Sequence, residues 1–247
     1  MFSLYCRSAF KVTEKLKKLF DFIKTLDSDA AAAELLWRTR HKKVIRIQIP
    51  PEAAPENRNN YQVVLKSYEE KRFFRYLFRP SLAFREWYGY QAVSGCGIPT
   101  AQVVAAEEIR RGLRLVKSVF ITEYINCTGD GDDFRLDGCR AHDKVMALEF
   151  TVKNLKLLAK LHRAKLVHGG LTPRNELYII KPEAQRRSGD QLDVIWIDLA
   201  TCRKAPFFQR SRLQKKDVDF FLSLMELPPD MEAGARKVYL EELKKNG

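Results

Sequence analysis

The sequence predicts an α+β fold of two lobes, in which the first lobe is strand-rich and the second is mainly helical. Three observations support this prediction. Several short apolar runs of β type surround one helical stretch in the first half. One long helical pattern and a small β-hairpin dominate the second half. The length of 247 residues fits two closely joined lobes at about 100–200 residues per domain, and we place their boundary near Ile125, as domains 1–125 and 126–247.

The first lobe is expected to begin with an amphipathic helix. Apolar residues recur at helical spacing between Val12 and Leu26, with lysines on the opposite face. Such a helix either packs on its own domain or lies on a membrane surface. The further elements predicted in this lobe are strands at residues 44–49, 61–66, 102–106 and 114–124, which we expect to form an antiparallel sheet, and a helix at residues 82–93.

A polar, acidic turn at residues 129–133 follows the boundary. It lacks the spacing and the terminal Glu of an EF-hand, so we interpret it as a linker rather than a calcium site. The longest helical pattern spans residues 142–162, two strands are predicted at residues 176–180 and 193–197, and the tail beyond Asp217 is helical by pattern. The apolar face predicted for the long helix consists of Val145, Leu148, Val152, Leu155, Leu158 and either Leu161 or His162.

The composition indicates a folded protein with an anionic partner. Lys and Arg total 44 against 31 Asp and Glu, which gives a net charge of +13 and a pI near 9.5. Hydrophobic residues make up 45% of the chain, which argues against intrinsic disorder. The five cysteines include no CxxC pair, so they indicate reduced cytoplasmic thiols rather than a disulfide framework or a zinc site. No apolar run approaches the roughly 18–20 residues of a membrane-spanning helix.

Four residues together predict phosphoryl transfer. Lys66 ends a β-type run, and Glu86 lies on the helix that follows. Asn175 ends a short loop after the long helix, and Asp198 terminates an apolar strand. Transfer of a phosphoryl group needs a cation on the donor phosphates, a carboxylate that orients the cation, and oxygen ligands for magnesium. Each residue alone also fits an ordinary surface pair or strand cap, so the prediction depends on their joint order, which is the order that kinases use.

In this order of motifs the sequence resembles the protein-kinase-like phosphotransferases. More narrowly, it resembles the lipopolysaccharide kinase family, the bacterial enzymes that phosphorylate Kdo or heptose of the lipid inner core. The resemblance covers roughly residues 40–225 and implies a bilobal protein-kinase-like fold. The motifs that carry it are VLKSY at residues 64–68, FRPSLAFREW at 78–87, GIPT at 97–100, LHR at 161–163, HGGLTPRN at 168–175, IDLA at 197–200 and KDV at 216–218.

The resemblance implies an ATP site between the lobes. Lys66 would bind the donor phosphates, and Glu86 would be its partner on the helix. Glu123 and Tyr124 fall where such folds place the hinge, whose contacts with adenine usually come from backbone groups. The sequence has no glycine-rich loop between its first strands, which is a departure from the kinase pattern.

The resemblance also implies a catalytic loop and a magnesium site. Asn175 and Asp198 would hold Mg²⁺, and His168 would open the catalytic loop in a mostly structural role. The loop departs from the family at Gly170, the position of the Asp that accepts the proton of the substrate hydroxyl. General-base help is worth about 10²–10⁴-fold, so its loss is severe but leaves positioning and electrostatic stabilisation in place.

These residues leave two functions open. The favoured one is transfer of the γ-phosphate of ATP to an anionic, lipid-linked sugar of the lipopolysaccharide core, at the inner face of the cytoplasmic membrane. The alternative is a pseudokinase that binds nucleotide and acts as a scaffold or regulator, because Gly170 cannot accept a proton. A third explanation is that an original Asp was replaced by design.

The positive charge is concentrated in two stretches. There is no Asp or Glu between Phe150 and Asn175, and none from Leu199 to Lys216. A basic rim beside the loop favours an acceptor that is already anionic, whereas the simpler alternative is a solvated basic face. Nucleic acid is disfavoured, because no RRM, KH, zinc-finger or helix-turn-helix pattern is present.

Overall fold

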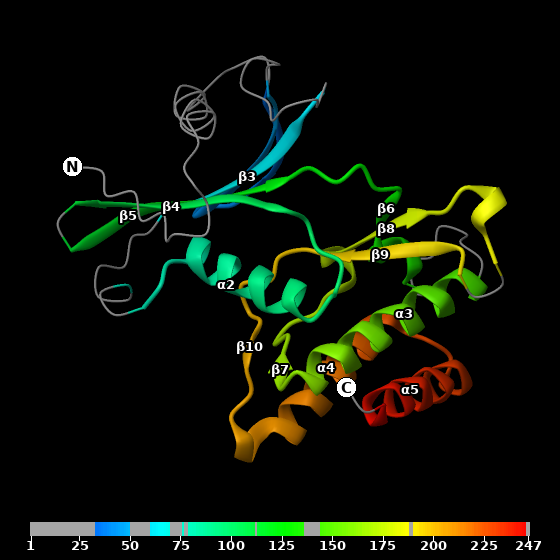
Figure 1. Cartoon of the computed structure of the whole chain (residues 1–247). Helices are drawn as coiled ribbons and strands as arrows, with labels where there is room; N and C mark the ends of the chain where they lie inside the picture. The colour runs from blue at the N-terminus through cyan, green and yellow to red at the C-terminus, as the bar shows by residue number, and fades with distance from the viewer. Residues whose placement is uncertain are drawn as a thin grey trace. The chain divides into compact units, whose positions relative to one another are not determined.

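The computed structural model describes residues 33–49, 60–69, 76, 79–111, 113–135, 144–187 and 190–245 (Figure 1). The amphipathic helix expected between Val12 and Leu26 lies outside these residues. The described residues form two compact units. The first takes those of Met1–Trp87 and Gln102–Ile125, and the second takes those of Tyr88–Ala101 and Asn126–Gly247. One division therefore falls after residue 125, and residues 88–101 belong with the second unit.

The first unit is built on a five-stranded antiparallel sheet with the order β1-β2-β3-β5-β4. The strands expected in this half of the chain are confirmed, and one strand at its start was not predicted. The bounds are β1 (Ala33–Arg38), β2 (Lys42–Gln48), β3 (Gln62–Glu69), β4 (Val103–Arg111) and β5 (Arg114–Glu123).

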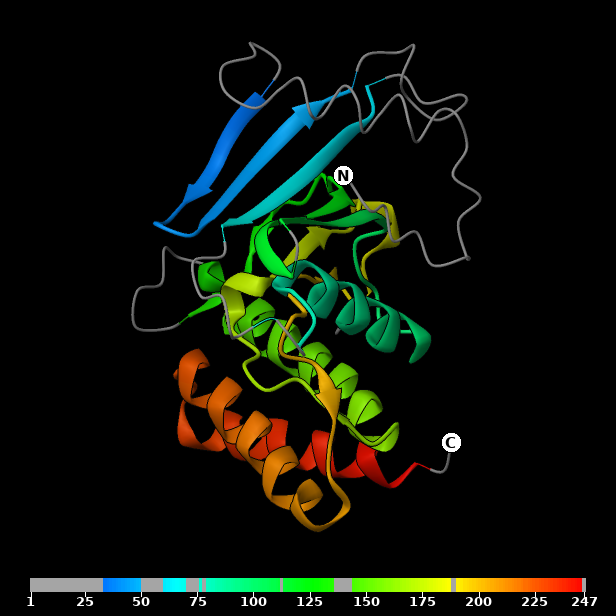
Figure 2. The same ribbon diagram turned by 90° about the vertical axis from the view of Figure 1, so that its left-hand side faces the viewer.

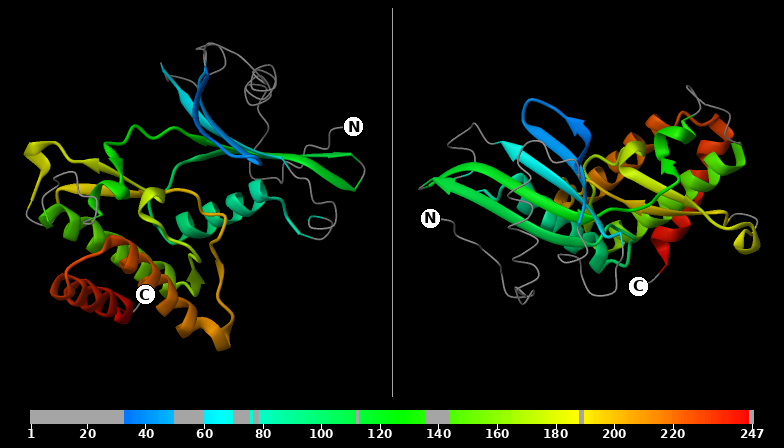
Figure 3. Two further views of the ribbon diagram at one scale, coloured as in Figure 1. Left: turned by 180° about the vertical axis from the view of Figure 1, so that it is seen from behind. Right: turned by 90° about the horizontal axis from the view of Figure 1, so that it is seen from above.

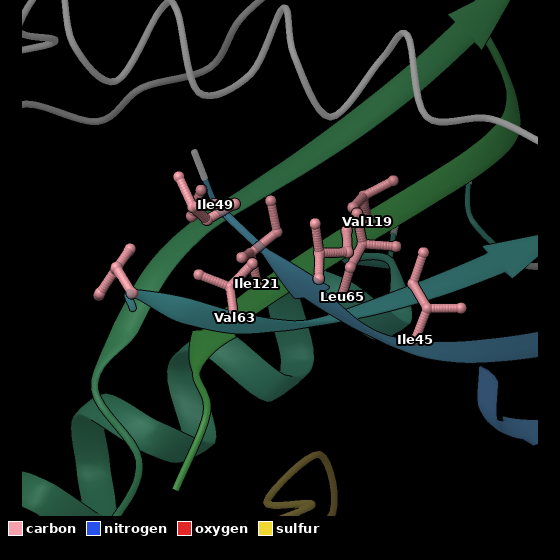
Figure 4. Close-up of a cluster of buried hydrophobic side chains, with 9 residues drawn as sticks. Ile45, Ile49, Val63, Leu65, Val119 and Ile121 are labelled. Carbon is pink, nitrogen blue, oxygen red and sulfur yellow. The ribbon is translucent and has the colours of Figure 1, made fainter. Parts of the chain in front are cut away.

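The apolar core of this sheet lies on one of its faces (Figure 4). Ile45 of β2 pairs with Leu65 of β3, which in turn pairs with Ile121 of β5, and all three side chains are buried. Successive side chains of a strand point to opposite faces. Lys66, the next residue of β3, therefore points to the face opposite this core.

Strand β1 was not predicted, because its sequence does not alternate between apolar and polar residues. It carries Leu35, Leu36 and Trp37 in succession instead of an alternation of apolar and polar residues. All three side chains are more than 40% exposed, since β1 lies at one end of the described strand order and pairs only with β2.

Helix α2 (Leu82–Gly95) confirms the helix expected at residues 82–93. Ser81 caps its start, because the hydroxyl oxygen accepts the backbone N–H of Phe84 at 3.3 Å. Gly97, just past its end, has φ +67°, the left-handed conformation that glycine adopts readily at a helix C-terminus.

The second unit combines helices with two small antiparallel sheets, ordered β6-β8-β9 and β10-β7. Figure 2 shows α3 beside α4 and α5, and Figure 3 shows the β8–β9 hairpin from two sides. The bounds are β6 (Gly129–Asp130), η2 (Gly131–Phe134), α3 (Lys144–Arg163), β7 (Leu166–Val167), η3 (Pro173–Asn175), β8 (Glu176–Ile180), η4 (Glu183–Gln185), β9 (Leu192–Trp196), β10 (Arg203–Lys204), η5 (Phe207–Gln209), α4 (Arg210–Met225) and α5 (Pro229–Lys244).

The buried face of α3 differs from the predicted apolar face at its beginning. Val145 is 56% exposed, whereas Glu149 and Asn154 are buried. Both polar side chains accept a hydrogen bond there: Asn154 Oδ1 accepts the indole N–H of Trp196 at 2.7 Å, and Glu149 Oε1 accepts the backbone N–H of Gln191 at 2.6 Å, while Glu149 Oε2 has no hydrogen-bond partner among the described residues. Apolar periodicity misses such residues because hydrogen bonds to the β8–β9 hairpin make their burial favourable.

Within the described ranges, no helix has both the length and the apolar character that crossing a bilayer requires.

Two helical glycines give opposite predictions for stability. A Cβ at Gly89 of α2 would overlap the carbonyl oxygen of Leu199, whereas a Cβ at Gly234 of α5 would meet no atom within 4 Å. We expect Gly89→Ala to destabilise the protein by about 1–3 kcal/mol through overpacking. Gly234→Ala should stabilise it by about 0.5–1 kcal/mol, because glycine is a poor helix former. Chemical denaturation of both variants measures the difference, and equal gains in both would contradict the close packing of Gly89.

Candidate active site

In the first unit, the structure brings Lys66 and Glu86 together. Lys66 Nζ lies 2.8 Å from Glu86 Oε2, and their side chains are only 9% and 0% exposed. The hydroxyl of Tyr68 donates to the other carboxylate oxygen of Glu86. Tyr68 is two residues after Lys66 on β3 and therefore on the same face of the sheet. Each oxygen of the buried carboxylate thus has a donor.

This arrangement fixes the direction of the Lys66 side chain. Glu86 accepts hydrogen bonds from two donors, Lys66 and Tyr68, and Glu86 in turn holds the ammonium group of Lys66. Removal of one partner from a buried ion pair costs about 3–5 kcal/mol, because it leaves the other charge buried without compensation. Lys66 and Glu86 were predicted as a pair, whereas Tyr68 was not, although the two-residue repeat of a strand places it on the same face as Lys66.

Glu123 and Tyr124, the residues predicted for the hinge, are tied to neighbouring strands. The backbone N–H of Glu123 donates to the carbonyl of Gln102 at 2.9 Å, and that of Tyr124 donates to the carbonyl of Gln62 at 3.0 Å. The Arg46 guanidinium lies 4.9 Å from the centre of the Tyr124 ring. These two N–H groups are thus engaged within the first unit.

In the second unit, the predicted catalytic loop is anchored by Asp217 of α4. Asp217 is buried and accepts the backbone N–H groups of His168 at 2.7 Å and Gly169 at 2.9 Å. Its Oδ2 also lies 3.3 Å from Nε2 of His162, which comes from α3. Burial alone would raise the pKa of Asp217, but the hydrogen bonds from His162 and the two amides hold it below its ordinary value. The loop therefore starts from a fixed, ionised anchor.

His168 itself is a buried, neutral residue. Its side chain is fully buried and its ring meets that of Trp196 edge-on, with 5.4 Å between the ring centres. Burial lowers the pKa of His168 to about 4, although the carboxylates of Asp217 and Asp198 act in the opposite direction. Neither ring nitrogen has a hydrogen-bond partner among the described residues. The ring is thus closed off from solvent, and the mostly structural role of His168 stays a prediction.

Asn175 and Asp198 lie at adjacent ends of the β8–β9 hairpin. Asn175 directly precedes β8, and its carbonyl accepts the backbone N–H of Ile197 at 2.9 Å. Asp198 follows Ile197 and has φ +59°, a left-handed conformation that is uncommon outside glycine. Such local strain is typical of functional sites, where the surrounding structure holds it.

The oxygen donors of Asn175 and Asp198 suit a hard cation. Magnesium prefers carboxylate and amide oxygens and completes its shell with phosphate oxygens and water. Among the described residues there is no cluster of three or more His, Cys, Asp or Glu that could hold a metal alone. Asn175 and Asp198 would therefore supply only part of the oxygen ligands of a magnesium ion, and phosphate and water would supply the rest.

Gly170 leaves open space at the position of the expected Asp. A Cβ there would meet only Thr201 Oγ1, at 3.9 Å, which is an ordinary contact. Its φ of +156° is a conformation that residues with a side chain rarely adopt. An aspartate at this position has room, but it requires a local adjustment of the backbone.

The chain is similar to one protein family and to solved structures of kinases. The family model described as "Lipopolysaccharide kinase (Kdo/WaaP) family" matches residues 61–236. The solved structure of WaaP in complex with acyl carrier protein has a TM-score of 0.61 at 15% sequence identity, and the alignment covers 90% of this chain and 82% of that one. The Rio2 kinase–ADP/Mg²⁺–phosphoaspartate complex from Chaetomium thermophilum has a TM-score of 0.52 at 14% identity, covering 94% and 66%. No curated protein matches the sequence. The structural likenesses confirm the predicted protein-kinase-like fold.

The anchor of the loop is testable with two aspartates of α4. We expect Asp217→Asn to lower the free energy of unfolding by about 1–3 kcal/mol, because it disturbs buried, charge-assisted hydrogen bonds. Asp219→Asn is the matched control: that side chain is 42% exposed and pairs with Arg236, so its loss should cost no more than about 1 kcal/mol. Amide hydrogen exchange at His168 and Gly169 should quicken only in Asp217→Asn, and unchanged exchange there would show that Asp217 does not anchor the loop.

Proposed function

Because the chain belongs to the lipopolysaccharide kinase (Kdo/WaaP) family, we propose that it transfers the γ-phosphate of ATP to a hydroxyl of an anionic core sugar, heptose or Kdo. The buried Lys66–Glu86 ion pair carries this proposal. A phosphoryl donor requires a cation whose position is fixed before the nucleotide arrives, and Glu86 fixes that of Lys66. An ordinary surface pair would be exposed and would have no reason to recruit a third group, Tyr68.

The residues of both units then have distinct roles. Lys66 binds the donor phosphates and Glu86 orients it. Asn175 and Asp198 hold Mg²⁺, which supplies charge neutralisation on the phosphate oxygens when it is bound. The ADP and Mg²⁺ of the Rio2 kinase complex support this choice of cofactors, since the two proteins share a fold. For adenine, the backbone after β5 is the candidate partner.

Gly170 favours the alternative function, a pseudokinase that binds nucleotide without efficient transfer. His168 cannot replace the missing base, because its ring is buried and its pKa is lowered to about 4 by burial. Residue 170 therefore gives no general-base help, and we expect the rate of phosphoryl transfer to be about 10²–10⁴-fold lower for that reason. Transfer that remains must come from positioning and from the charges of Lys66 and the metal site.

A lipid-linked acceptor also requires contact with a membrane, and two exposed aromatic residues support such contact. Phe207 and Phe208 of η5 are 85% and 82% exposed. Lys204 precedes them, and Arg210 and Arg212 follow. Adjacent apolar and cationic side chains are typical of segments that lie in the interface of an anionic bilayer. We place the peripheral contact with the inner face of the cytoplasmic membrane in this segment, in addition to the amphipathic helix expected between Val12 and Leu26.

Nucleotide binding and transfer test the kinase proposal. We expect ATP with Mg²⁺ to raise the melting temperature of the chain, and this shift to vanish in Asp198→Asn and in the double variant Lys66→Met/Glu86→Gln. The double variant removes both charges, so it leaves no buried ion uncompensated. The exposed Lys156→Met, on α3, is the matched control and should keep the shift. Absence of a shift in the unmodified chain and in Gly170→Asp would reject the proposal.

Phosphate transfer to core oligosaccharide, measured on the same proteins, separates the two functions. Transfer by the unmodified chain supports the kinase, and Gly170→Asp should then be faster by up to about 10²–10⁴-fold. A shift without transfer, with transfer gained in Gly170→Asp, would identify the pseudokinase instead.

The membrane contact predicts binding to vesicles of phosphatidylcholine and phosphatidylglycerol in a sedimentation assay. The double variant Phe207→Ser/Phe208→Ser should bind on the order of tenfold more weakly, because two large apolar side chains no longer enter the interface. Leu113→Ser, at a side chain that is 74% exposed in the first unit, is the control and should bind normally. Equal binding by all three proteins would remove Phe207 and Phe208 from the membrane contact.

A further inference from the structure

A pocket of about 190 Å³ opens beside Gly170 within the second unit. One wall is the backbone of Gly169 and Gly170. The other lining residues are Val167 of β7, Arg203 of β10, and Leu213, Lys216, Asp217 and Phe220 of α4. The position that an aspartate at residue 170 would occupy therefore adjoins a hollow whose lining includes two cations, one carboxylate and one aromatic ring.

Among the residues that the structure describes, the two cations of this pocket have no ion-pair partner, because no carboxylate lies within 4 Å of Arg203 or Lys216. Other cations of the second unit do pair: Lys153 and Lys181 both bind Asp190 at 2.7 Å, and Arg236 binds Asp219 at 2.6 Å. Two cations that line the same pocket without a carboxylate partner are available for an anionic ligand.

The one carboxylate in the wall does not cancel this charge. Asp217 directs its oxygens toward the amides of His168 and Gly169 and toward His162. Its pKa stays below the ordinary value, despite burial, because of these hydrogen bonds, so it contributes one negative charge. Against the charges of Arg203 and Lys216, the pocket lining keeps one net positive charge.

A second, open hollow of about 560 Å³ continues along α4. It shares Lys216 and Phe220 with the first and adds Arg212 and Lys215. Its acidic residue, Asp219, is already paired with Arg236. Because the two hollows share Lys216 and Phe220, we treat them as one groove along α4 that starts at Gly170. Among the described residues its lining holds four cations, and both of its acids, Asp217 and Asp219, are engaged by other partners.

We propose that this groove binds the acceptor through at least two of its anionic groups, phosphate or carboxylate. One group lies between Arg203 and Lys216 beside Gly170, and the next lies near Arg212 and Lys215. The ring of Phe220, common to both hollows, packs against the apolar face of the sugar between them. This inference rests on the proposed kinase function for the identity of the acceptor, but the binding of anions does not depend on phosphate transfer.

Titration calorimetry of the full chain without nucleotide tests the groove. The probes are fructose 1,6-bisphosphate, which carries two phosphates on one sugar, and inorganic phosphate. We expect the bisphosphate to bind more tightly than phosphate. Arg203→Gln and Lys216→Gln should each weaken its binding on the order of 10-fold or more, as expected for loss of a charged hydrogen-bond donor. Gly170→Asp should also weaken it, because it adds a negative charge beside the first site.

Two further variants locate the binding. Lys237→Gln, at an exposed lysine of α5, should bind the bisphosphate normally. The double variant Lys66→Met/Glu86→Gln should also bind it normally, which separates the groove from the site for donor phosphates. Unchanged binding in Arg203→Gln/Lys216→Gln, or an equal loss in Lys237→Gln, would overturn the inference.

Kinetics with core oligosaccharide distinguish failure of the groove from failure of the proposed function. Arg203→Gln should raise KM for the acceptor on the order of 10-fold with little change in kcat, because the lost contact is with a group that does not react. Transfer with an unchanged KM would reject the groove and keep the kinase. Specific binding of the bisphosphate without any transfer would keep the groove and reject the kinase.

Discussion

The structure of the second unit depends on the ionised carboxylate of Asp217. It joins α4, which carries it, to the loop after β7 through two backbone amides, and to α3 through His162. His162 in turn contacts the Tyr239 hydroxyl of α5 at 2.7 Å. An ionised group at this depth is favourable only when its hydrogen bonds replace the lost water. Because the donors come from different elements, the loop and three helices must adopt their positions together.

Several other acidic side chains of the second unit are, like Asp217, engaged by partners within the fold. Acidic residues of the second unit are used within the fold: Asp217 anchors a loop, Asp190 joins Lys153 to Lys181, and Asp219 pairs with Arg236. The basic residues exceed the acidic ones in the chain. Among the described residues, Arg203 of β10 and Arg212, Lys215 and Lys216 of α4 have no ion-pair partner, and they line the hollows beside Gly170. A net charge of +13 alone indicates only an anionic partner, whereas the positions of these cations are the basis for the groove that we propose.

Sequence patterns predicted those parts of the fold and the candidate site that depend on local order. Lys66 and Glu86 were identified because a strand and the next helix place them in the order kinases use, and β2, β3 and β5 alternate clearly. The apolar face predicted for α3 wrongly included Val145, which is exposed, and left out Asn154, which is buried. The burial of the Asn154 amide depends on a hydrogen bond from the Trp196 indole, which lies far away in sequence. The contacts of Tyr68 and Asp217 were not predicted for the same reason, because each residue acts through a partner on another helix, strand or loop.

Gly170 bears on both proposals, because it lies at the expected position of the general base and also lines the cationic pocket. A glycine at this position removes a proton acceptor, and it also removes a negative charge from the wall of a cationic pocket. With an aspartate there, the acidic charges of Asp217 and residue 170 would balance those of Arg203 and Lys216. With glycine, one positive charge remains uncompensated. Under the two proposals made above, glycine at this position gives up general-base help and strengthens the attraction of an anionic acceptor. For the proposed kinase this combination favours retention of the acceptor over rapid turnover, and for the alternative pseudokinase it favours binding alone.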